Sequence, residues 1–68
     1  METINVIIGI ERSGRTDEVL EHTVVDVFRD EEKAHRAGKD WEARRNEEHT
    51  EEGLNIKASY KIVKRTLK

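Results

Sequence analysis

The stretch that most constrains the fold is TINVIIGIE, residues 3–11, in which apolar side chains recur at every second position. Its even positions are all apolar: Ile4, Val6, Ile8 and Ile10. Its odd positions are more mixed: Thr3, Asn5, Ile7, Gly9 and Glu11. Such alternation is typical of a strand that is buried on one face. We therefore predict a β-strand whose even positions face the core and whose odd positions, including Ile7, face outward.

A second strand is predicted over residues 19–28, VLEHTVVDVF, and a turn separates it from the first. In the turn segment RSGRTD, Gly14 is expected to take a positive φ, which glycine adopts without steric strain. Two strands joined by so short a segment predict an antiparallel hairpin. Both faces of the second strand are partly apolar, so one face needs a cover besides the core. A bulge or a second subunit would supply that cover.

A helix is predicted next, between the N-cap residue Asp30 and the stop residue Gly53. Small residues recur on one side of this helix at helical spacing, and a single tryptophan follows them: Ala34, Ala37, Gly38 and Trp41. The small residues let the helix approach the sheet, and we expect Trp41 to be the core anchor. The last turn is acidic, which opposes the helix dipole. We therefore expect the helix to fray near His49.

The final stretch, LNIKASYKIVKRTL, residues 54–67, alternates again and predicts a third strand. The residues expected to face the core are Leu54, Ile56, Ala58, Tyr60 and Ile62, and the outward set includes Lys57, Lys61, Val63 and Arg65. A helical crossover makes the third strand parallel to the second, and the first strand then fits between them, antiparallel to both. The prediction is one α+β domain over residues 1–68, with ββαβ element order, a three-stranded antiparallel sheet of order 2-1-3 and one helix on one face.

The charge is distributed unevenly along the chain. The last sixteen residues hold five of the thirteen Lys and Arg residues and none of the fifteen acids. Lysines on an edge strand oppose edge-to-edge aggregation, which is a sufficient reason for this pattern. An apolar centre with a charged rim is alternatively the usual anatomy of a protein interface. On that second interpretation, the partner-binding residues are Ile7, Val63, Lys57, Lys61 and Arg65. Both interpretations stay open at this level.

No residue pattern predicts a catalytic or metal site. The chain has no cysteine, and therefore neither a thiolate ligand nor a disulfide. His22 lies mid-strand, His35 beside the apolar stripe of the helix, and His49 among acids at the helix end, without ligands that converge on one point. Ser13 and Ser59 have no histidine or acid at a spacing typical of nucleophilic catalysis. We predict a protein that is not an enzyme and uses no cofactor or metal.

The size of the chain favours a partner. A domain of 68 residues with 34% hydrophobic residues has a thin core, and such domains often depend on a partner for stability. We expect a homodimer that buries the outer sheet face. The apolar run over residues 4–10 is too short to span a membrane, and no targeting segment precedes it, so a cytoplasmic location is expected. Nucleic acid is the alternative partner, because the basic last strand could contact phosphates.

The stretch VVDVFRDEEKAHRA, residues 24–37, resembles a pattern found in short phage and prophage proteins, where a strand runs into a capped helix. The matching positions are Val25, Val27, Phe28, Asp30, Glu32, Lys33 and Ala34. The resemblance implies a small α+β accessory protein that inhibits a host protein, such as a defence or nucleic-acid-processing protein, by occluding its surface in the host cytoplasm. No functional residue is carried over, because the matching positions are structural.

Overall fold

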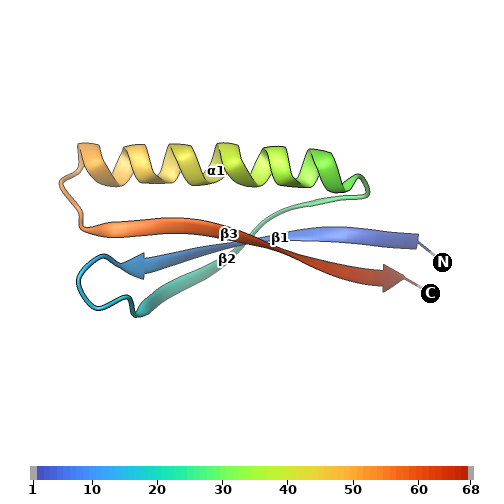
Figure 1. The fold of residues 1–68 in the computed structure, drawn as a ribbon, viewed down its shortest axis with the longest axis horizontal. Coiled ribbons are helices and arrows are strands. Elements are labelled where there is room, and N and C mark those ends of the chain that lie inside the picture. The colour runs from blue at the N-terminus through green and yellow to red at the C-terminus, as the bar shows by residue number, and fades with distance from the viewer. Residues whose placement is uncertain (1, 68) are drawn as a thin grey trace.

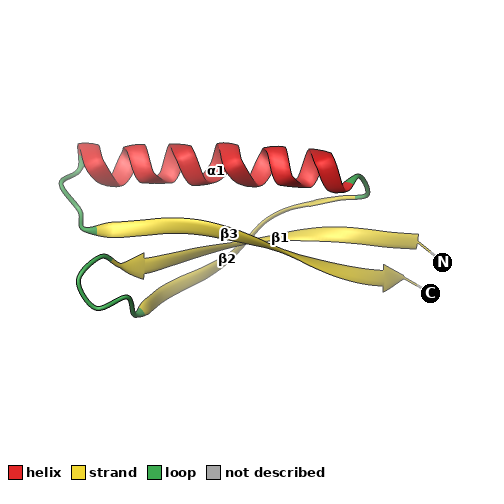
Figure 2. Ribbon diagram, viewed as in Figure 1, coloured by secondary structure: helices red, strands yellow, loops and turns green. Residues whose placement is uncertain are grey.

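The computed structural model describes residues 2–67 and contains four elements in the order ββαβ (Figures 1 and 2). They are β1 (Glu2–Ser13), β2 (Val19–Phe28), α1 (Glu31–Glu51) and β3 (Ile56–Leu67). The strands form one antiparallel sheet in the order β2-β1-β3, and the helix packs on one face of it. The predicted α+β fold class and strand order are therefore confirmed. No helix within residues 2–67 is long and apolar enough to cross a membrane.

The central strand β1 pairs with β3 without any shift in register. Its pairing with β2 shifts between Ile7 and Ile8, which leaves Val25 without a direct partner on β1, and shifts once more toward the hairpin turn. A β-bulge of this kind changes which side chains share a face. As a result, Val24 and Val27 lie on the same face although they are three positions apart. The bulge resolves the ambiguity of the second strand, whose two faces are both partly apolar.

The turn between β1 and β2 has its positive φ at Asp17, at 61°, and not at Gly14. The prediction for Gly14 is therefore wrong. The backbone N–H of Gly14 donates to the carbonyl oxygen of Asn55 at 2.8 Å. A Cβ at Gly14 would clash with the side-chain amide of Asn55. A larger residue at this position would therefore have to displace that amide from the loop that precedes β3.

Both ends of α1 have identifiable caps. Oδ1 of Asp30 accepts hydrogen bonds from the backbone N–H groups of Glu32 at 2.8 Å and Lys33 at 3.2 Å, as the capping prediction requires. Beyond the last turn, Gly53 has a φ of 72°, in the left-handed region that glycine tolerates. The helix continues through His49, which is only 4% exposed. The fraying predicted near His49 is therefore not observed, because buried polar contacts hold this turn against β1, and the helix ends at Glu51.

The helix covers the odd-numbered face of β1, which is the opposite of the prediction. The Trp41 ring lies directly on Gly9, where an added Cβ would be 2.5 Å from Cη2 of the ring. Ile7, which was predicted to face outward, is fully buried at 0% exposure. The physical reason is space, since Gly9 leaves room for the indole and a row of isoleucines would not. The isoleucine-rich even face of β1 consequently points away from α1.

The predicted orientation of β3 is confirmed. Tyr60 lies against Gly38 of the helix, where an added Cβ would be 2.5 Å from Cδ2 of the tyrosine ring. Ala58 is 5% exposed, and the side chain of Asn46 donates to its carbonyl oxygen at 3.1 Å and accepts from its N–H at 2.8 Å. Leu54, which was expected to face the core, precedes the strand and is 45% exposed.

The resulting core is small. The buried apolar residues within the described range are Ile7, Ile10, Ala34 and Ala58, and among them only Ile7 is a large side chain with no exposed surface. Six large apolar side chains are exposed instead: Val19, Leu20, Val24, Val27, Leu54 and Leu67. Small domains bury a low fraction of their surface and are correspondingly marginal in stability. These six side chains leave apolar surface exposed to solvent on the folded chain.

Candidate functional site

The face of the sheet that α1 leaves uncovered is the candidate site, and we call it the open sheet face. It comprises Glu2, Ile4, Val6, Ile8, Ile10 and Arg12 of β1, Val19, His22, Val24 and Val27 of β2, and Lys57, Ser59, Lys61, Val63, Arg65 and Leu67 of β3. Directly paired residues of antiparallel strands share a face, so the two registers define this set. Figure 1 shows the helix along one side of the sheet only.

The centre of the open sheet face is apolar. Val24 and Val27 are 63% and 44% exposed, while Ile4 and Ile8 beside them are partly buried by their neighbours. Ile10, at 8% exposure, is the most buried member of the set. Contiguous apolar surface on a monomer, rimmed by polar residues, is a mark of an interaction site. The composition of this face therefore indicates binding.

The rim along β3 is basic. Lys57, Lys61 and Arg65 lie on the open sheet face and are exposed, and within residues 2–67 none of them forms an ion pair. Lys64 lies on the other face and pairs with Glu31 at 3.1 Å. The predicted placement of the three rim cations is confirmed, and so is that of Val63, which pairs with Val6 on the same face.

Ile7 is the one predicted partner-binding residue that the structure removes from the site, because it lies under the helix. Its place in the apolar centre is taken by Ile4, Val6 and Ile8, which were predicted to form the core. The open sheet face is therefore more apolar than the sequence indicated.

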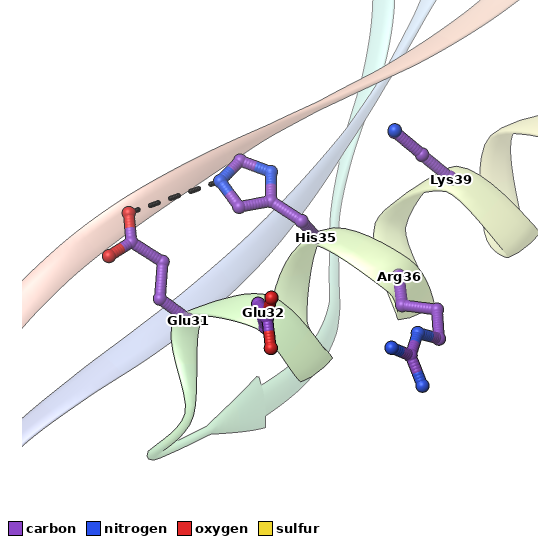
Figure 3. A pocket seen from close by; sticks show the side chains of 5 residues that line it. All are labelled: Glu31, Glu32, His35, Arg36 and Lys39. Atoms are coloured by element: carbon purple, nitrogen blue, oxygen red, sulfur yellow. Dashed lines mark ion pairs between the residues drawn. The ribbon is translucent and has the colours of Figure 1, made fainter.

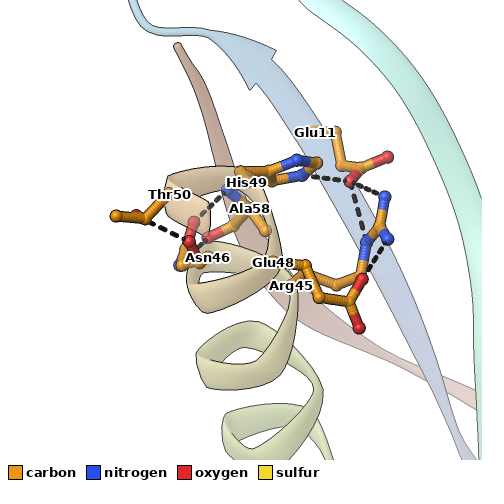
Figure 4. Close-up of polar contacts among 7 residues, drawn as sticks. All are labelled: Glu11, Arg45, Asn46, Glu48, His49, Thr50 and Ala58. Carbon is orange, nitrogen blue, oxygen red and sulfur yellow. Dashed lines mark hydrogen bonds and ion pairs between the residues drawn. The ribbon is translucent and has the colours of Figure 1, made fainter. Parts of the chain in front are cut away.

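A buried polar cluster on the opposite, helix-covered face was missed by the sequence analysis (Figure 4). Oε1 of Glu11 accepts hydrogen bonds from Nε and Nη2 of Arg45 at 3.0 and 2.7 Å, and lies 2.7 Å from Nε2 of His49. Burial by itself raises the pKa of Glu11, but the hydrogen bonds and charges of Arg45 and His49 outweigh burial and hold this pKa below its usual 4.5. The signal in the sequence was Trp41, Arg45 and His49 at successive spacings of four, which continue the buried side of the helix.

This cluster fastens the C-terminal end of α1 to β1. The side chains of Glu11 and His49 are 10% and 6% exposed, and they meet through a single carboxylate oxygen. Nδ1 of His49 has no hydrogen-bond partner among residues 2–67. Across residues 2–67, no group of three or more His, Cys, Asp or Glu side chains could hold a metal ion.

A surface depression of about 430 Å³ lies at the start of α1 (Figure 3). The five residues that line it all carry charged or titratable side chains and are all exposed, so the depression is open to solvent: Glu31, Glu32, His35, Arg36 and Lys39. Nδ1 of His35 lies 3.2 Å from the hydroxyl oxygen of Tyr60, and Nε2 of His35 lies 3.9 Å from Oε1 of Glu31. Small-molecule sites are mostly apolar and enclosed. The depression therefore does not have the character of a ligand pocket.

Comparison with known proteins finds no matching family model, no similar curated protein and no similar solved structure. The resemblance of residues 24–37 to phage proteins therefore stays a prediction, and the open sheet face is interpreted from its own chemistry.

Proposed function

We propose that this chain is a non-enzymatic binding protein that docks onto another polypeptide through the open sheet face. The observation that carries the proposal is the apolar centre of that face, over which no helix or strand of residues 2–67 packs and in which Val24 and Val27 are exposed. Removing apolar surface from water is the dominant favourable term in protein association. Because Ile7 is the single large, fully buried side chain among residues 2–67, covering this face would add the second half of a core.

The rim specifies the chemistry of the partner. Lys57, Lys61 and Arg65 lie along one edge of the apolar centre and have no anionic partner among the described side chains. Complementary charges across an interface steer the encounter and set specificity more than they set affinity. The partner is therefore a polypeptide surface with an apolar centre and an acidic margin.

The alternative partner is nucleic acid, which the same three cations could contact through phosphates. Two observations favour a polypeptide instead. Single-stranded nucleic acid is usually held by aromatic side chains on which bases stack, but Trp41 of α1 and Tyr60 of β3 are packed between the helix and the sheet. Most positions next to Lys61 and Arg65 are apolar, namely Ile4, Ile8 and Val63, and offer no hydrogen bonds to bases or phosphates, whereas Ser59 alone adds a hydroxyl between Lys57 and Lys61.

A narrower proposal, that the partner is a host protein whose surface is occluded in the host cytoplasm, rests only on the resemblance of residues 24–37 to phage proteins.

The test uses the wild type, Val24→Lys and Lys39→Glu as bait in nuclease-treated bacterial lysate. A protein that the wild type captures is then purified, and its affinity for each of the three forms is measured directly. Val24→Lys places a charge in the apolar centre at a position that is 63% exposed, so the fold tolerates it. We expect this variant to bind at least about tenfold more weakly, or about 1.4 kcal/mol. Lys39→Glu, on the exposed side of the helix, is the control and should bind like the wild type. Equal binding by Val24→Lys would refute the proposal.

A gel shift with generic duplex and single-stranded DNA at low salt separates the two classes of partner. We expect no shift at micromolar protein, because the chain carries fifteen acids and a net charge of −2. A gel shift that the combined variant Lys57→Glu, Lys61→Glu and Arg65→Glu abolishes would show that the partner of this face is nucleic acid and not a polypeptide.

A further inference from the structure

We propose that the occupant of the open sheet face is a different polypeptide whose carboxylates bind around Ser59, at the hairpin end of that face, where β1 runs into the turn to β2. This inference rests on the proposed function and specifies the charge of the partner and the place where that charge binds. It is argued from a group of cations that share this end of the face: Arg12, Lys57 and Lys61.

The strand register places these cations around one residue. Arg12 of β1 is the direct partner of Lys57 of β3, and directly opposed residues have Cβ atoms ~5 Å apart. Lys57 and Lys61 lie two positions to either side of Ser59, which is roughly 7 Å along the strand. Carboxylates accept strong, charge-assisted hydrogen bonds from Arg and Lys side chains. A carboxylate above Ser59 would therefore meet three cations and a hydroxyl group.

The opposition of Arg12 and Lys57 has little compensation on this face. Like charges directly opposite each other in a sheet are destabilising. Nη1 of Arg12 lies 3.9 Å from Oδ2 of Asp17 and 3.4 Å from its carbonyl oxygen, and exposed ion pairs of this kind contribute little. The neighbours of the two cations on the open sheet face carry no charge: Val19, Ile10 and Ser59. A carboxylate from a partner would offset the repulsion.

The opposite end of the face already contains an acid. Arg65 pairs with Ile4, and the next residue of β1 on this face is Glu2. Oε1 of Glu2 lies 3.4 Å from Nη2 of Arg29. The apolar residues of the centre lie between the two ends of the face: Val6, Ile8, Val24, Val27 and Val63. The partner is therefore a polypeptide whose acids lie at one end of an apolar stretch.

The charge of the face also disfavours a second copy as the occupant. Among residues 2–67, the open sheet face carries four cations and a single acid, although the chain has a net charge of −2. Glu21 and Asp26 of β2 lie on the helix-covered face. The homodimer that the thin core favours would bring two positively charged faces together, whichever way one copy is turned. Like charges brought together across an interface suppress that partner, which selects a different chain.

A titration with a defined acidic peptide tests the site directly. The probe is hexaglutamate with acetylated and amidated ends, and hexaglutamine is the uncharged control. At low salt we expect hexaglutamate to shift the backbone amide signals of Arg12, Lys57 and Ser59 in a saturable manner. These shifts should be several-fold larger than those of Arg36 and Lys39, which are exposed cations of α1. Hexaglutamine should shift none of them.

Lys57→Glu separates binding from stability. The new carboxylate would lie opposite Arg12, and opposite charges in a cross-strand pair stabilise a sheet, so the variant should melt no lower than the wild type. We expect it to bind the protein captured from lysate at least about tenfold more weakly. Arg65→Glu, at the other end of the face, should weaken this binding about threefold or less. Lys39→Glu makes the same change of charge on α1 and should bind like the wild type.

Three results would overturn the inference. Shifts that are absent from the hairpin end, or spread equally over the cations of α1, would remove the carboxylate site. Stronger shifts of the same residues by hexathymidylate would assign the site to the phosphates of a nucleic acid. A wild-type dimer in sedimentation equilibrium, in place of the expected monomer of 7.9 kDa, that Val24→Lys dissociates would show that a second copy occupies the face.

The proposed function is tested separately. If hexaglutamate does not bind at the hairpin end but Val24→Lys weakens the binding of the captured protein, the inference fails and the proposed function stands. If Val24→Lys has no effect on that binding, the proposed function fails.

Discussion

Gly9→Ala probes the contact that determines which face of β1 lies under the helix. An added Cβ would lie 2.5 and 2.6 Å from Cη2 and Cζ2 of Trp41 and 3.0 Å from Cζ3. Carbon atoms in optimal contact are ~3.5–4.0 Å apart, so the indole must move by roughly 1 Å. Overpacking of this kind costs about 1–3 kcal/mol. Alanine in a strand is more favourable than glycine by roughly 0.5–1 kcal/mol, so we expect a net loss of stability of about 1 kcal/mol.

The sign of the effect should reverse when the indole is removed. In a Trp41→Ala background the clash is absent, and Gly9→Ala should then stabilise the chain by roughly 0.5–1 kcal/mol. The double-mutant cycle should therefore give a coupling energy of about 1–3 kcal/mol. The free energy of unfolding of all four proteins is measured in urea by far-ultraviolet circular dichroism, because tryptophan fluorescence is lost in the Trp41→Ala background. All four are compared at the same chain concentration, because any association contributes to stability. An equal effect of Gly9→Ala in both backgrounds would refute the contact and the placement of α1 derived from it.

Three further predictions concern stability. Trp41→Ala alone should cost about 3 kcal/mol in thermal or urea unfolding, the lower end for large aromatic truncations, because Trp41 is partly exposed. Glu11→Gln should cost about 1.5–3 kcal/mol, as expected for losing charge-assisted hydrogen bonds to Arg45 and His49. The pKa of Glu11 is lowered in the folded chain, so the unfolded chain binds more protons near and below pH 4.5. The free energy of unfolding should therefore fall as the pH drops through that range. In Glu11→Gln the melting temperature should fall less steeply over the same range, because this carboxyl group is absent. Asp30→Ala should cost about 1 kcal/mol through loss of the N-cap, and Asp30→Asn, which keeps the capping oxygen, should restore most of it.

Periodicity in the sequence predicted the architecture well. Alternation in residues 3–11 and 54–67, with a capped helix between two of the strands, was sufficient for the ββαβ order and the sheet order β2-β1-β3. The face of β3 was also predicted correctly, because Lys57, Ser59 and Lys61 alternate with the apolar or aromatic residues Ile56, Ala58, Tyr60 and Ile62 in its first half. In these segments local pattern and tertiary packing favour the same arrangement.

Periodicity failed where the face of β1 had to be chosen. Its two faces differ in apolar content, and the more apolar one was assigned to the core by the usual rule. The side of the helix that faces the sheet, however, carries Trp41, Arg45 and His49. The Trp41 ring requires space above the strand, and Arg45 and His49 require a carboxylate as their hydrogen-bond partner. Gly9 supplies the space and Glu11 the carboxylate, so the less apolar face lies inside. The misplacement of Ile7 and the missed polar cluster have this single cause.

The central claim is that the isoleucine-rich face of β1 points away from α1 and meets a second polypeptide. Nuclear Overhauser effects in isotope-filtered spectra of a mixed labelled sample test both parts at once. We expect contacts within one chain between the Trp41 ring protons and the α-protons of Gly9, and contacts from the Ile8 methyl groups to a second chain. Contacts between the Ile8 methyl groups and the Trp41 ring of the same chain would contradict the account.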